Sequence, residues 1–492
     1  MDLKSLGRNT IIYAVGNVGL RAASFLLIPL YAHVLSKADF GRLATVIFTV
    51  QIMLVLMNAG VREALVRFSS EARENGRTGE LLGTCLLITA MGGGVVTGAS
   101  LLLFRGFLGD ALRTADATGY VLFACAIAAS RTLAGQFLNH YRATNRAGSF
   151  LAAGLSIAGV LVAANGVTVG LLGMGVRGAL IAQLTAYLGG LLAMAAIVLP
   201  RTGLRASWRT AGRVLAFGGP LVVSEASWFV MLGAPVYFLS HYSGLEEVAV
   251  YSLGFKLAQV VVIMLVLPFQ LAYSPFVFSR LKDPSIGDAM SRALTYFVLA
   301  FVAVAFGILA ASRVLVPVIA PAGYGAAGLV LLALLPAMFF QGIESFGKTL
   351  LHIERKSYVT GAVAGAAGAV SVLLNLFLVP RFGWRGAVAS SGIATALAAG
   401  LVMAAAMRTY PVRVELGRIA VGLMGFGLVA LGFVALRDVS ATVYLLVAVP
   451  AAGVATGALM LSGFFDAAER AFLLKAVARV ARAIGLRKGR SP

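Results

Sequence analysis

Six ionisable side chains lie within long apolar stretches of this chain, where a charge is costly. They comprise four cations and two acids: Arg21, Arg131, Lys256, Lys348, Glu225 and Glu344. A charge at the centre of a bilayer costs at least ~2.5 kcal/mol on insertion scales, so such a residue usually faces a cavity, a partner or a ligand. An excess of cations favours an anionic ligand, because phosphate and pyrophosphate gain charge-assisted hydrogen bonds from guanidinium groups.

Arg21 lies in the middle of its apolar stretch and belongs to a polar stripe. Tyr13, Asn17, Arg21 and Ser24 recur every three to four residues, which places them on one face of a helix. We expect Asn17 and Arg21 to line water and to bind substrate, with Arg131 as a further substrate-binding residue. For both arginines the structural alternative is a buried guanidinium that donates hydrogen bonds to backbone carbonyls.

The other four ionisable residues lie in the second half of the chain. Lys256 and Lys348 are cations that could bind the same anion, although both lie near the ends of their apolar stretches, where a long side chain can reach the interface. Glu344 and Lys348 are four residues apart on a helix and could neutralise each other. Glu225 and Glu344 are the candidates for binding a coupling ion, H⁺ or Na⁺.

Cysteine and histidine indicate no further chemistry. Cys85 and Cys125 have no metal-ligand spacing, and two thiols make no disulfide framework. The four histidines are far apart and form no metal-binding HExxH pattern. We therefore expect no catalytic residues, no metal and no cofactor apart from a coupling ion.

Nearly the whole chain consists of apolar stretches long enough to span a membrane. Hydrophobic residues make up 60% of it and charged residues only 12%, too few to cover a soluble protein of 492 residues. A spanning helix needs roughly 20 mostly apolar residues. The sequence predicts an all-α polytopic membrane protein with 14 transmembrane helices, at residues 9–34, 41–60, 81–104, 118–139, 149–172, 178–199, 214–240, 248–272, 293–312, 326–349, 357–380, 386–407, 418–436 and 441–463.

The distribution of basic residues predicts the orientation of these helices. With the N-terminus inside, the cytoplasmic segments carry 27 of the 40 Lys and Arg residues, whereas the external loops carry nine. Cytoplasmic loops are enriched in Lys and Arg, so both termini are expected in the cytoplasm of a bacterial inner-membrane protein. The net charge of +21 then reflects topology, and we expect no nucleic-acid partner.

The chain contains an internal repeat at an offset of 208 residues. Gly175-Val-Arg-Gly-Ala recurs as Gly383-Trp-Arg-Gly-Ala, and Ser149-Phe150 recurs as Ser357-Tyr358. Each copy holds six spans, an even number, so the copies cross the membrane in the same sense. We expect two parallel six-helix lobes at residues 1–208 and 209–416, with spans 13 and 14 added at 417–463.

The C-terminal tail, residues 464–492, has the pattern of a basic amphipathic helix. Leu473, Val477, Val480 and Ile484 follow helical spacing, and basic residues occupy other parts of the wheel. Such a helix is suited to lie on anionic lipids of the inner leaflet. Docking on a partner protein is the alternative.

Three segments carry a family resemblance. Residues 30–41 contain Leu-Tyr-Ala followed by Leu-Ser-Lys-Ala-Asp-Phe-Gly, residues 246–257 read Glu-Glu-Val-Ala-Val-Tyr-Ser-Leu-Gly-Phe-Lys-Leu, and residues 374–380 read Leu-Asn-Leu-Phe-Leu-Val-Pro, followed by Gly383, Gly386 and Ala387. The chain resembles, over about residues 5–407, the polysaccharide-biosynthesis flippases of the multidrug/oligosaccharidyl-lipid/polysaccharide exporter (MOP) superfamily.

The resemblance implies a transporter rather than an enzyme. Members have two six-helix lobes and work by alternating access, many with ion coupling, and the polysaccharide branch moves undecaprenyl-pyrophosphate-linked oligosaccharide to the outer leaflet. By resemblance, Arg21 and Arg131 would hold the pyrophosphate. The implied substrate is thus a lipid-linked oligosaccharide for surface polysaccharide biosynthesis, and polysaccharide polymerase machinery is a possible partner.

Four other functions compete with this interpretation. A lipid II flippase of the same superfamily shares the charge pattern. A multidrug/cation antiporter is disfavoured because the first lobe has no acid within its predicted spans. A membrane glycosyltransferase or polymerase typically has paired carboxylates in a large external loop or a cytoplasmic domain, and neither is found here. The last alternative is a structural scaffold for assembly.

The polar stripe around Arg21 leads to a first prediction. Arg21→Ala should leave folding largely intact, because a small apolar residue suits a spanning helix, yet it should abolish export of surface polysaccharide. Export can be measured in cells whose own transporter has been deleted, with protein level in the membrane as the control. Wild-type export by the variant would remove Arg21 from the mechanism.

Overall fold

The computed structural model describes residues 16, 19, 22–279, 286–353, 356–409 and 415–461. Helices make up 91% of the described part of the chain, and no strand occurs in it. Asn17, Arg21 and the predicted basic tail at 464–492 lie outside the described residues.

Eleven helical segments in the described ranges are long and apolar enough to cross a membrane. Two shorter apolar helices, Ala22–Val34 and Ala441–Val454, fall within the first and last predicted spans. The chain is therefore an all-helical, multi-pass membrane protein, and the count of fourteen spans stays a prediction.

The first half of the chain forms a group of packed helices. Helix α6 packs against α2, α4 and α8, and α7 packs against α8. The elements are α2 (Lys37–Asn58), α3 (Val61–Glu74), α4 (Thr78–Ala99), the π-helical η1 (Ser100–Phe104), α5 (Arg105–Leu112), α6 (Ala117–Ala143), α7 (Ala147–Asn165), the π-helical η2 (Gly166–Leu171) and α8 (Gly175–Thr202).

The second half forms another group, in which α13 packs against α10 and α15, and α14 packs against α9 and α15. Its elements are α9 (Trp208–Tyr242), α10 (Leu245–Val261), the π-helical η3 (Val262–Val266), α11 (Leu267–Ser279), α12 (Ile286–Ile319), the 3₁₀ turn η4 (Ala322–Tyr324), α13 (Ala327–Ile353), α14 (Ser357–Phe382), α15 (Trp384–Thr409), α16 (Leu416–Ala435) and α17 (Ala441–Leu461).

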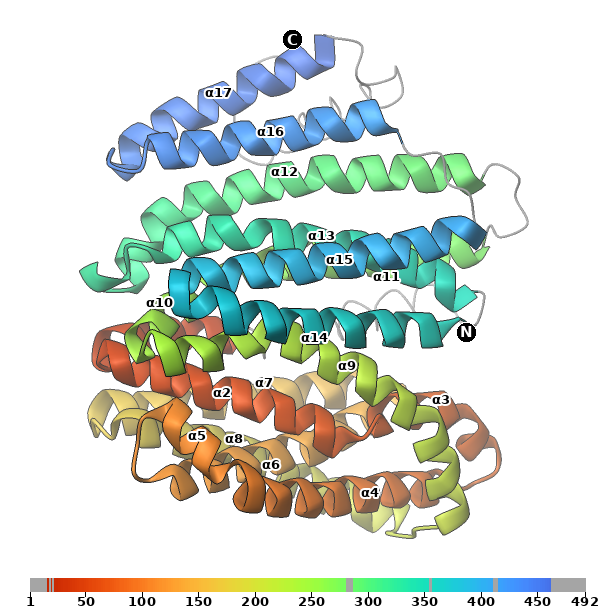
Figure 1. Cartoon of the computed structure of the whole chain (residues 1–492). Helices are drawn as coiled ribbons and strands as arrows, with labels where there is room; N and C mark the ends of the chain where they lie inside the picture. The colour runs from red at the N-terminus through yellow and green to blue at the C-terminus, as the bar shows by residue number, and fades with distance from the viewer. Residues whose placement is uncertain are drawn as a thin grey trace, which may run out of the picture.

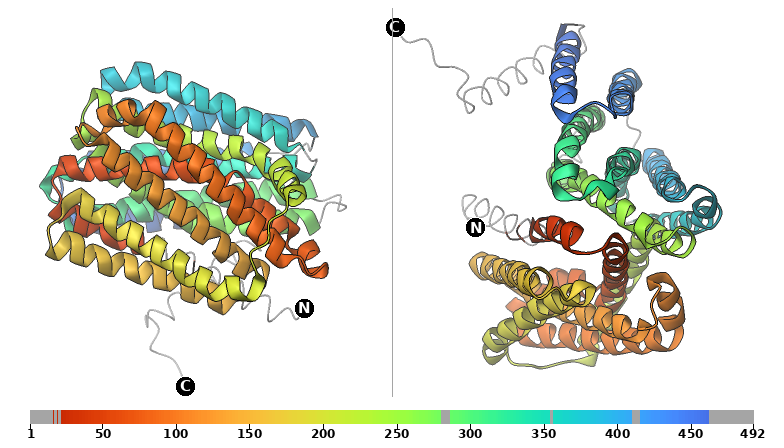
Figure 2. Two further views of the ribbon diagram at one scale, coloured as in Figure 1. Left: turned by 90° about the horizontal axis from the view of Figure 1, so that it is seen from below. Right: turned by 90° about the vertical axis from the view of Figure 1, so that its left-hand side faces the viewer.

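The two groups lie side by side with their helices running in roughly the same direction (Figure 1). Seen from the left-hand side of that view, α4 to α8 lie at one end of the molecule and α12 to α17 at the other (Figure 2, right). The groups meet where α2 packs against α9 and α10.

Helix α9 contacts both groups. Its first part packs on α3 and α4, where Thr210 Oγ1 donates a 2.7 Å hydrogen bond to Glu80. Its later part packs on α14, where Ser371 Oγ donates to the carbonyl of Met231. Figure 1 shows α9 changing direction beside α3. Pro220 and Pro235 lie within it, and an internal proline removes a helical hydrogen bond and favours a bend.

The stretch 61–79, the longest interruption between predicted spans, forms helix α3 over most of its length. The chain turns at Ala59 (φ 48°) and Gly60 (φ 69°), both left-handed, so α3 starts in a new direction after α2 ends. Helix α3 then buries Val61, Ala64 and Leu65 and exposes charged side chains. Because the segment is highly charged, the sequence predicted a loop, whereas the structure has an amphipathic helix that packs on the bundle through one face.

Arg313 attaches the last two helices to α12. Its guanidinium contacts the rings of Phe433 and Tyr444, 4.4 and 4.8 Å from their centroids, and donates a 2.6 Å hydrogen bond to the carbonyl of Arg437. Because α12 is the main packing partner of both α16 and α17, this one side chain reinforces their principal contact with the bundle.

The crossing of α9 with the α2–α3 turn leads to a second prediction. A Cβ atom on Gly218 would lie 2.7 Å from the backbone carbonyl of Gly60, whereas a Cβ on Gly212, earlier in α9, would meet nothing within 4 Å. Gly218→Ala should lower the free energy of unfolding by about 1–3 kcal/mol through overpacking. Gly212→Ala, the matched control, should raise it by up to ~1 kcal/mol through helix propensity. Thermal unfolding in detergent tests this, and equal midpoints would contradict the close crossing.

Candidate functional site

Lys256 lies on α10 where the two groups of helices meet. It is half-buried, and its Nζ lies 5.5 Å from the centroid of the Phe40 ring on α2. Among the described residues it forms no ion pair with a carboxylate. It lies inside the apolar segment Leu245–Ser274, and the expectation that its side chain reaches the interface stays a prediction. An aromatic face compensates a cation only partly, at about 0.5–2 kcal/mol.

Arg131 lies within the first group, on α6 facing α8. Its guanidinium carbon is 5.3 Å from the centroid of the Tyr187 ring, and the side chain is half-buried. Within the described part of the chain no hydrogen bond from Arg131 to a backbone carbonyl, the structural alternative, is found. The partner that the structure shows for this side chain is the Tyr187 ring.

Glu225 on α9 is paired with a cation that the sequence pattern did not reveal. Arg62 Nη2 lies 2.9 Å from Glu225 Oε1 and 2.6 Å from Glu63 Oε1. The side chains of Glu225 and Arg62 keep 34% and 52% of their surface exposed. The sequence pattern placed Arg62 in a loop, and only the packing of α3 on α9 brings it to Glu225.

Glu344 and Lys348 form the ion pair that their spacing on α13 predicted. Lys348 Nζ lies 2.9 Å from Glu344 Oε1, with 5% of the Glu344 side chain and 30% of the Lys348 side chain exposed. Lys348 is thus committed to a buried carboxylate. This pair contacts neither Lys256 nor Glu225 through any ion pair or hydrogen bond found in the described residues.

Amide side chains in the first group form a buried network. Gln136 Nε2 on α6 donates to Asn58 Oδ1 on α2 at 3.3 Å and to Thr89 Oγ1 on α4 at 3.2 Å. Tyr31 donates a 2.7 Å hydrogen bond to Asn165 Oδ1 on α7. Because buried polar groups need partners, these bonds fix how the helices pack in this group.

A hollow of about 670 Å³ lies between the two groups at the end where α2 begins. The first group contributes Lys37, Arg42 and Arg113, and the second contributes Glu246, Glu247 and Trp384. Lys37 and Glu246 face each other at 3.8 Å. The hollow is therefore lined by both cations and carboxylates, whereas Lys256 has no carboxylate partner among the described residues.

The described site therefore consists of two kinds of ionisable residue. Both candidate acids are paired with cations, while Arg131 and Lys256 are held by aromatic rings alone among the described residues. Arg131 lies inside the first group and Lys256 lies between the groups, so the structure does not bring the two together. Arg21 and Asn17 cannot be placed relative to them, since both lie outside the described residues.

Comparison with protein families gives a match over residues 6–282 to the model described as "Polysaccharide biosynthesis protein". A comparison with curated protein sequences finds no significant match.

Several solved structures share the fold at low sequence identity. A lipid II flippase MurJ in an inward closed conformation has a TM-score of 0.71 at 11% identity, covering 92% of this chain and all of that one. An inward-facing multidrug resistance MATE family transporter of the MOP superfamily has a TM-score of 0.61 at 14% identity, covering 85% and 96%. A MOP superfamily transporter from Pyrococcus furiosus has a TM-score of 0.59 at 14% identity, covering 82% and 95%.

The Glu344–Lys348 pair leads to a third prediction. Lys348→Met leaves a buried carboxylate without its counterion and should lower the free energy of unfolding by about 3 kcal/mol. The double variant Glu344→Gln/Lys348→Met should recover most of that loss, because an amide next to an apolar side chain leaves no unpaired charge. Thermal unfolding in detergent distinguishes the two. A double variant as unstable as the single one would show that Lys348 stabilises the fold through more than its ion pair with Glu344.

Proposed function

Because the chain belongs to the polysaccharide biosynthesis protein family, we propose that it is a flippase for undecaprenyl-pyrophosphate-linked oligosaccharide in the bacterial inner membrane. It would move this lipid from the inner to the outer leaflet by alternating access, for surface polysaccharide biosynthesis. The pyrophosphate would be held by cationic side chains between the helices, the sugar by water and polar groups, and the prenyl tail would stay in lipid.

The single observation that supports an anionic head group is the unpaired charge of Lys256. It lies where α2 meets α10, and no carboxylate in the described residues neutralises it. Both acids within the predicted spans already have cationic partners, so the described ionisable residues of these spans leave a net positive charge. An ammonium group bound only to a ring gains further stabilisation from a phosphate oxygen.

The packing supports the proposed arrangement of two lobes of six helices each. Helices α2 and α10 begin 208 residues apart, and they pack against each other across the boundary. Equivalent elements of two copies commonly meet at the axis that relates them. We propose lobes at 1–208 and 209–416, fourteen spans, and an N-terminus and a C-terminus in the cytoplasm. Arg21 and Asn17 remain proposed substrate-binding residues, with Lys256 and Arg131.

Of the two candidate acids, Glu225 is the better proposal for a coupling site for H⁺ or Na⁺. An ion reaches an exposed acid more readily than a buried one, and the Glu225 side chain is 34% exposed whereas that of Glu344 is 5% exposed. Protonation or Na⁺ binding at Glu225 would release Arg62, which links α3 to α9. The anionic lipids of the inner leaflet and polysaccharide polymerase machinery remain proposed partners.

A lipid II flippase is the second candidate. The fold similarity to the lipid II flippase MurJ over 92% of this chain favours it, although a match at 11% identity shows only that the fold is shared. The multidrug MATE transporters share the fold as well. For a cation exporter we expect an acid left free for its substrate, whereas Glu225 and Glu344 are both paired with cations.

Translocation in proteoliposomes separates these functions. The purified protein should move a fluorescent undecaprenyl-pyrophosphate oligosaccharide between leaflets faster than lipid II, and a fluorescent organic cation should not be transported. Repeating the assay with H⁺ and Na⁺ gradients identifies the coupling ion. Faster movement of lipid II would favour the second candidate, and cation transport alone would overturn the proposal.

The role of Lys256 gives a fourth prediction. Lys256→Met should slow translocation of the pyrophosphate-linked lipid about tenfold or more, because a charge-assisted hydrogen bond contributes about 1.5–3 kcal/mol. Lys256→Arg should retain most of the rate. The control is Arg177→Ala, which removes an exposed arginine paired with Asp116. Equal rates for Lys256→Met and the control would remove Lys256 from substrate binding.

A further inference from the structure

The C-terminal end of α9 is capped by an arginine from the other group of helices. The last four carbonyls of a helix have no partner within it. At this end Ser243 N and Gly244 N both donate to the carbonyl of Leu239. Arg113, in the turn between α5 and α6, donates from Nε to the carbonyl of Ser240 at 3.1 Å and from Nη2 to the carbonyl of His241 at 3.2 Å. A cation at this end also stabilises the helix dipole.

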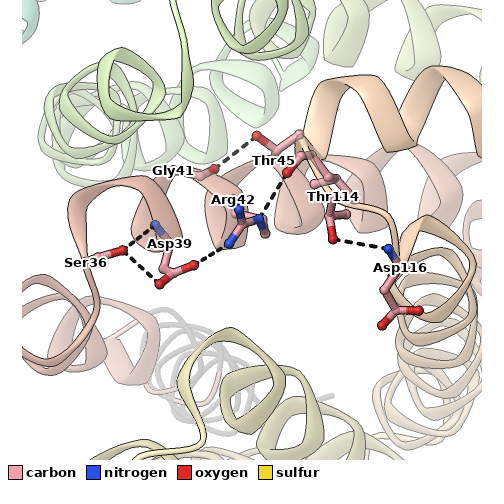
Figure 3. A network of polar contacts seen from close by, with 8 residues as sticks. Ser36, Asp39, Gly41, Arg42, Thr45, Thr114 and Asp116 are labelled. Atoms are coloured by element: carbon pink, nitrogen blue, oxygen red, sulfur yellow. Dashed lines mark hydrogen bonds and ion pairs between the residues drawn. The ribbon is translucent and has the colours of Figure 1, made fainter.

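The turn that carries Arg113 is held in place from α2. Arg42 Nε donates a 3.0 Å hydrogen bond to the carbonyl of Leu112, the residue before Arg113, and Arg42 is itself ion-paired with Asp39. Ser36 caps the start of α2 and bonds the same Asp39 carboxylate. Figure 3 shows this chain of contacts from Ser36 through Asp39 to Arg42, beside the turn at Thr114 and Asp116. The position of Arg113 is therefore set by its own half of the chain.

The backbone of Arg113 is left-handed, with φ at 48°. This is the conformation that follows the end of a helix, and glycine adopts it without the strain that a side chain causes. An arginine at this position has a backbone cost that a glycine would avoid, so its side chain must contribute something that offsets this cost. The contact with the α9 carbonyls is such a contribution.

Other contacts close the two groups at the same end. Ser240 Oγ donates to the carbonyl of Ala111, and both residues are buried. A Cβ atom on Gly41 would lie 1.9 Å from the carbonyl oxygen of Leu245, so the backbones of α2 and α10 touch. Further along α2, Thr49 and Tyr237 share a 2.8 Å hydrogen bond between the groups. Arg113 forms part of the wall of the hollow at this end.

We propose that Arg113 is a latch. It holds the two groups of helices together at the end where α2 begins, which faces outside in the proposed topology and is called the outer mouth below. Its hydrogen bonds to the carbonyls of Ser240 and His241 must break before the α9–α10 turn can separate from the α5–α6 turn. Arg113 is solvent-exposed, so its bonds are weak enough to break in each transport cycle. The assignment of this end to the outside, and of the cargo, rests on the proposed function, whereas the latch itself is a property of the contacts.

The latch can be tested by accessibility to a thiol reagent in the absence of substrate. Cys85 and Cys125 are first replaced by alanine, and Thr49→Cys then places a thiol below the closed mouth. Thr49 is 6% exposed, so a membrane-impermeant maleimide should label it slowly from outside. Arg113→Gly should raise the labelling rate about tenfold, because it removes the guanidinium while relieving the left-handed backbone. The same reaction in inside-out vesicles establishes which face the mouth opens to.

Two controls keep this test interpretable. Arg177→Ala removes an exposed arginine whose partner, Asp116, belongs to the same half of the chain, so it should leave labelling unchanged. The thermal midpoint of Arg113→Gly should equal or exceed that of the parent, which rules out a loosened fold. Parent-like labelling of Arg113→Gly from both faces would overturn the latch, whereas increased labelling in inside-out vesicles alone would overturn the assignment of this end to the outside. Failure of lipid translocation with increased labelling would instead count against the proposed function alone.

Discussion

Uncompensated charge in hydrocarbon is the constraint on which the rest of this structure depends. The described ionisable residues of the predicted spans meet it in two ways. Glu225 and Glu344 are each paired with a cation, whereas Arg131 and Lys256 each lie against an aromatic ring. A ring face stabilises a cation without neutralising it. Both acids are thus neutralised and these two cations are not, so the net charge of these described residues is positive.

Helix α9 links the parts that would have to move relative to one another. It is bound to the first half of the chain near its start, through Glu80 and the Gly60–Gly218 crossing, and again at its end, through Arg113. Between these points it packs on α14 and α15 of the second half. The predicted boundary at residue 208 places α9 in the second half of the chain, although this helix contacts both halves.

The sequence predicted the helices well because hydrophobic length is a local property. It also predicted the Glu344–Lys348 pair, since residues four apart on a helix are neighbours. It missed α3, whose charges resemble those of a loop, and with it Arg62 as the partner of Glu225. Arg113 carried no sequence signal, since its partners are backbone carbonyls 127 and 128 residues away.

The attachment of α16 and α17 through Arg313 has a consequence for how the molecule divides into moving parts. Both helices pack chiefly on α12, whose Arg313 guanidinium contacts one ring from each of them and bonds to a backbone carbonyl. If the second half of the chain moves during transport, α16 and α17 would therefore move together with α12. An acyl chain in contact with them would then meet the same surface throughout that movement.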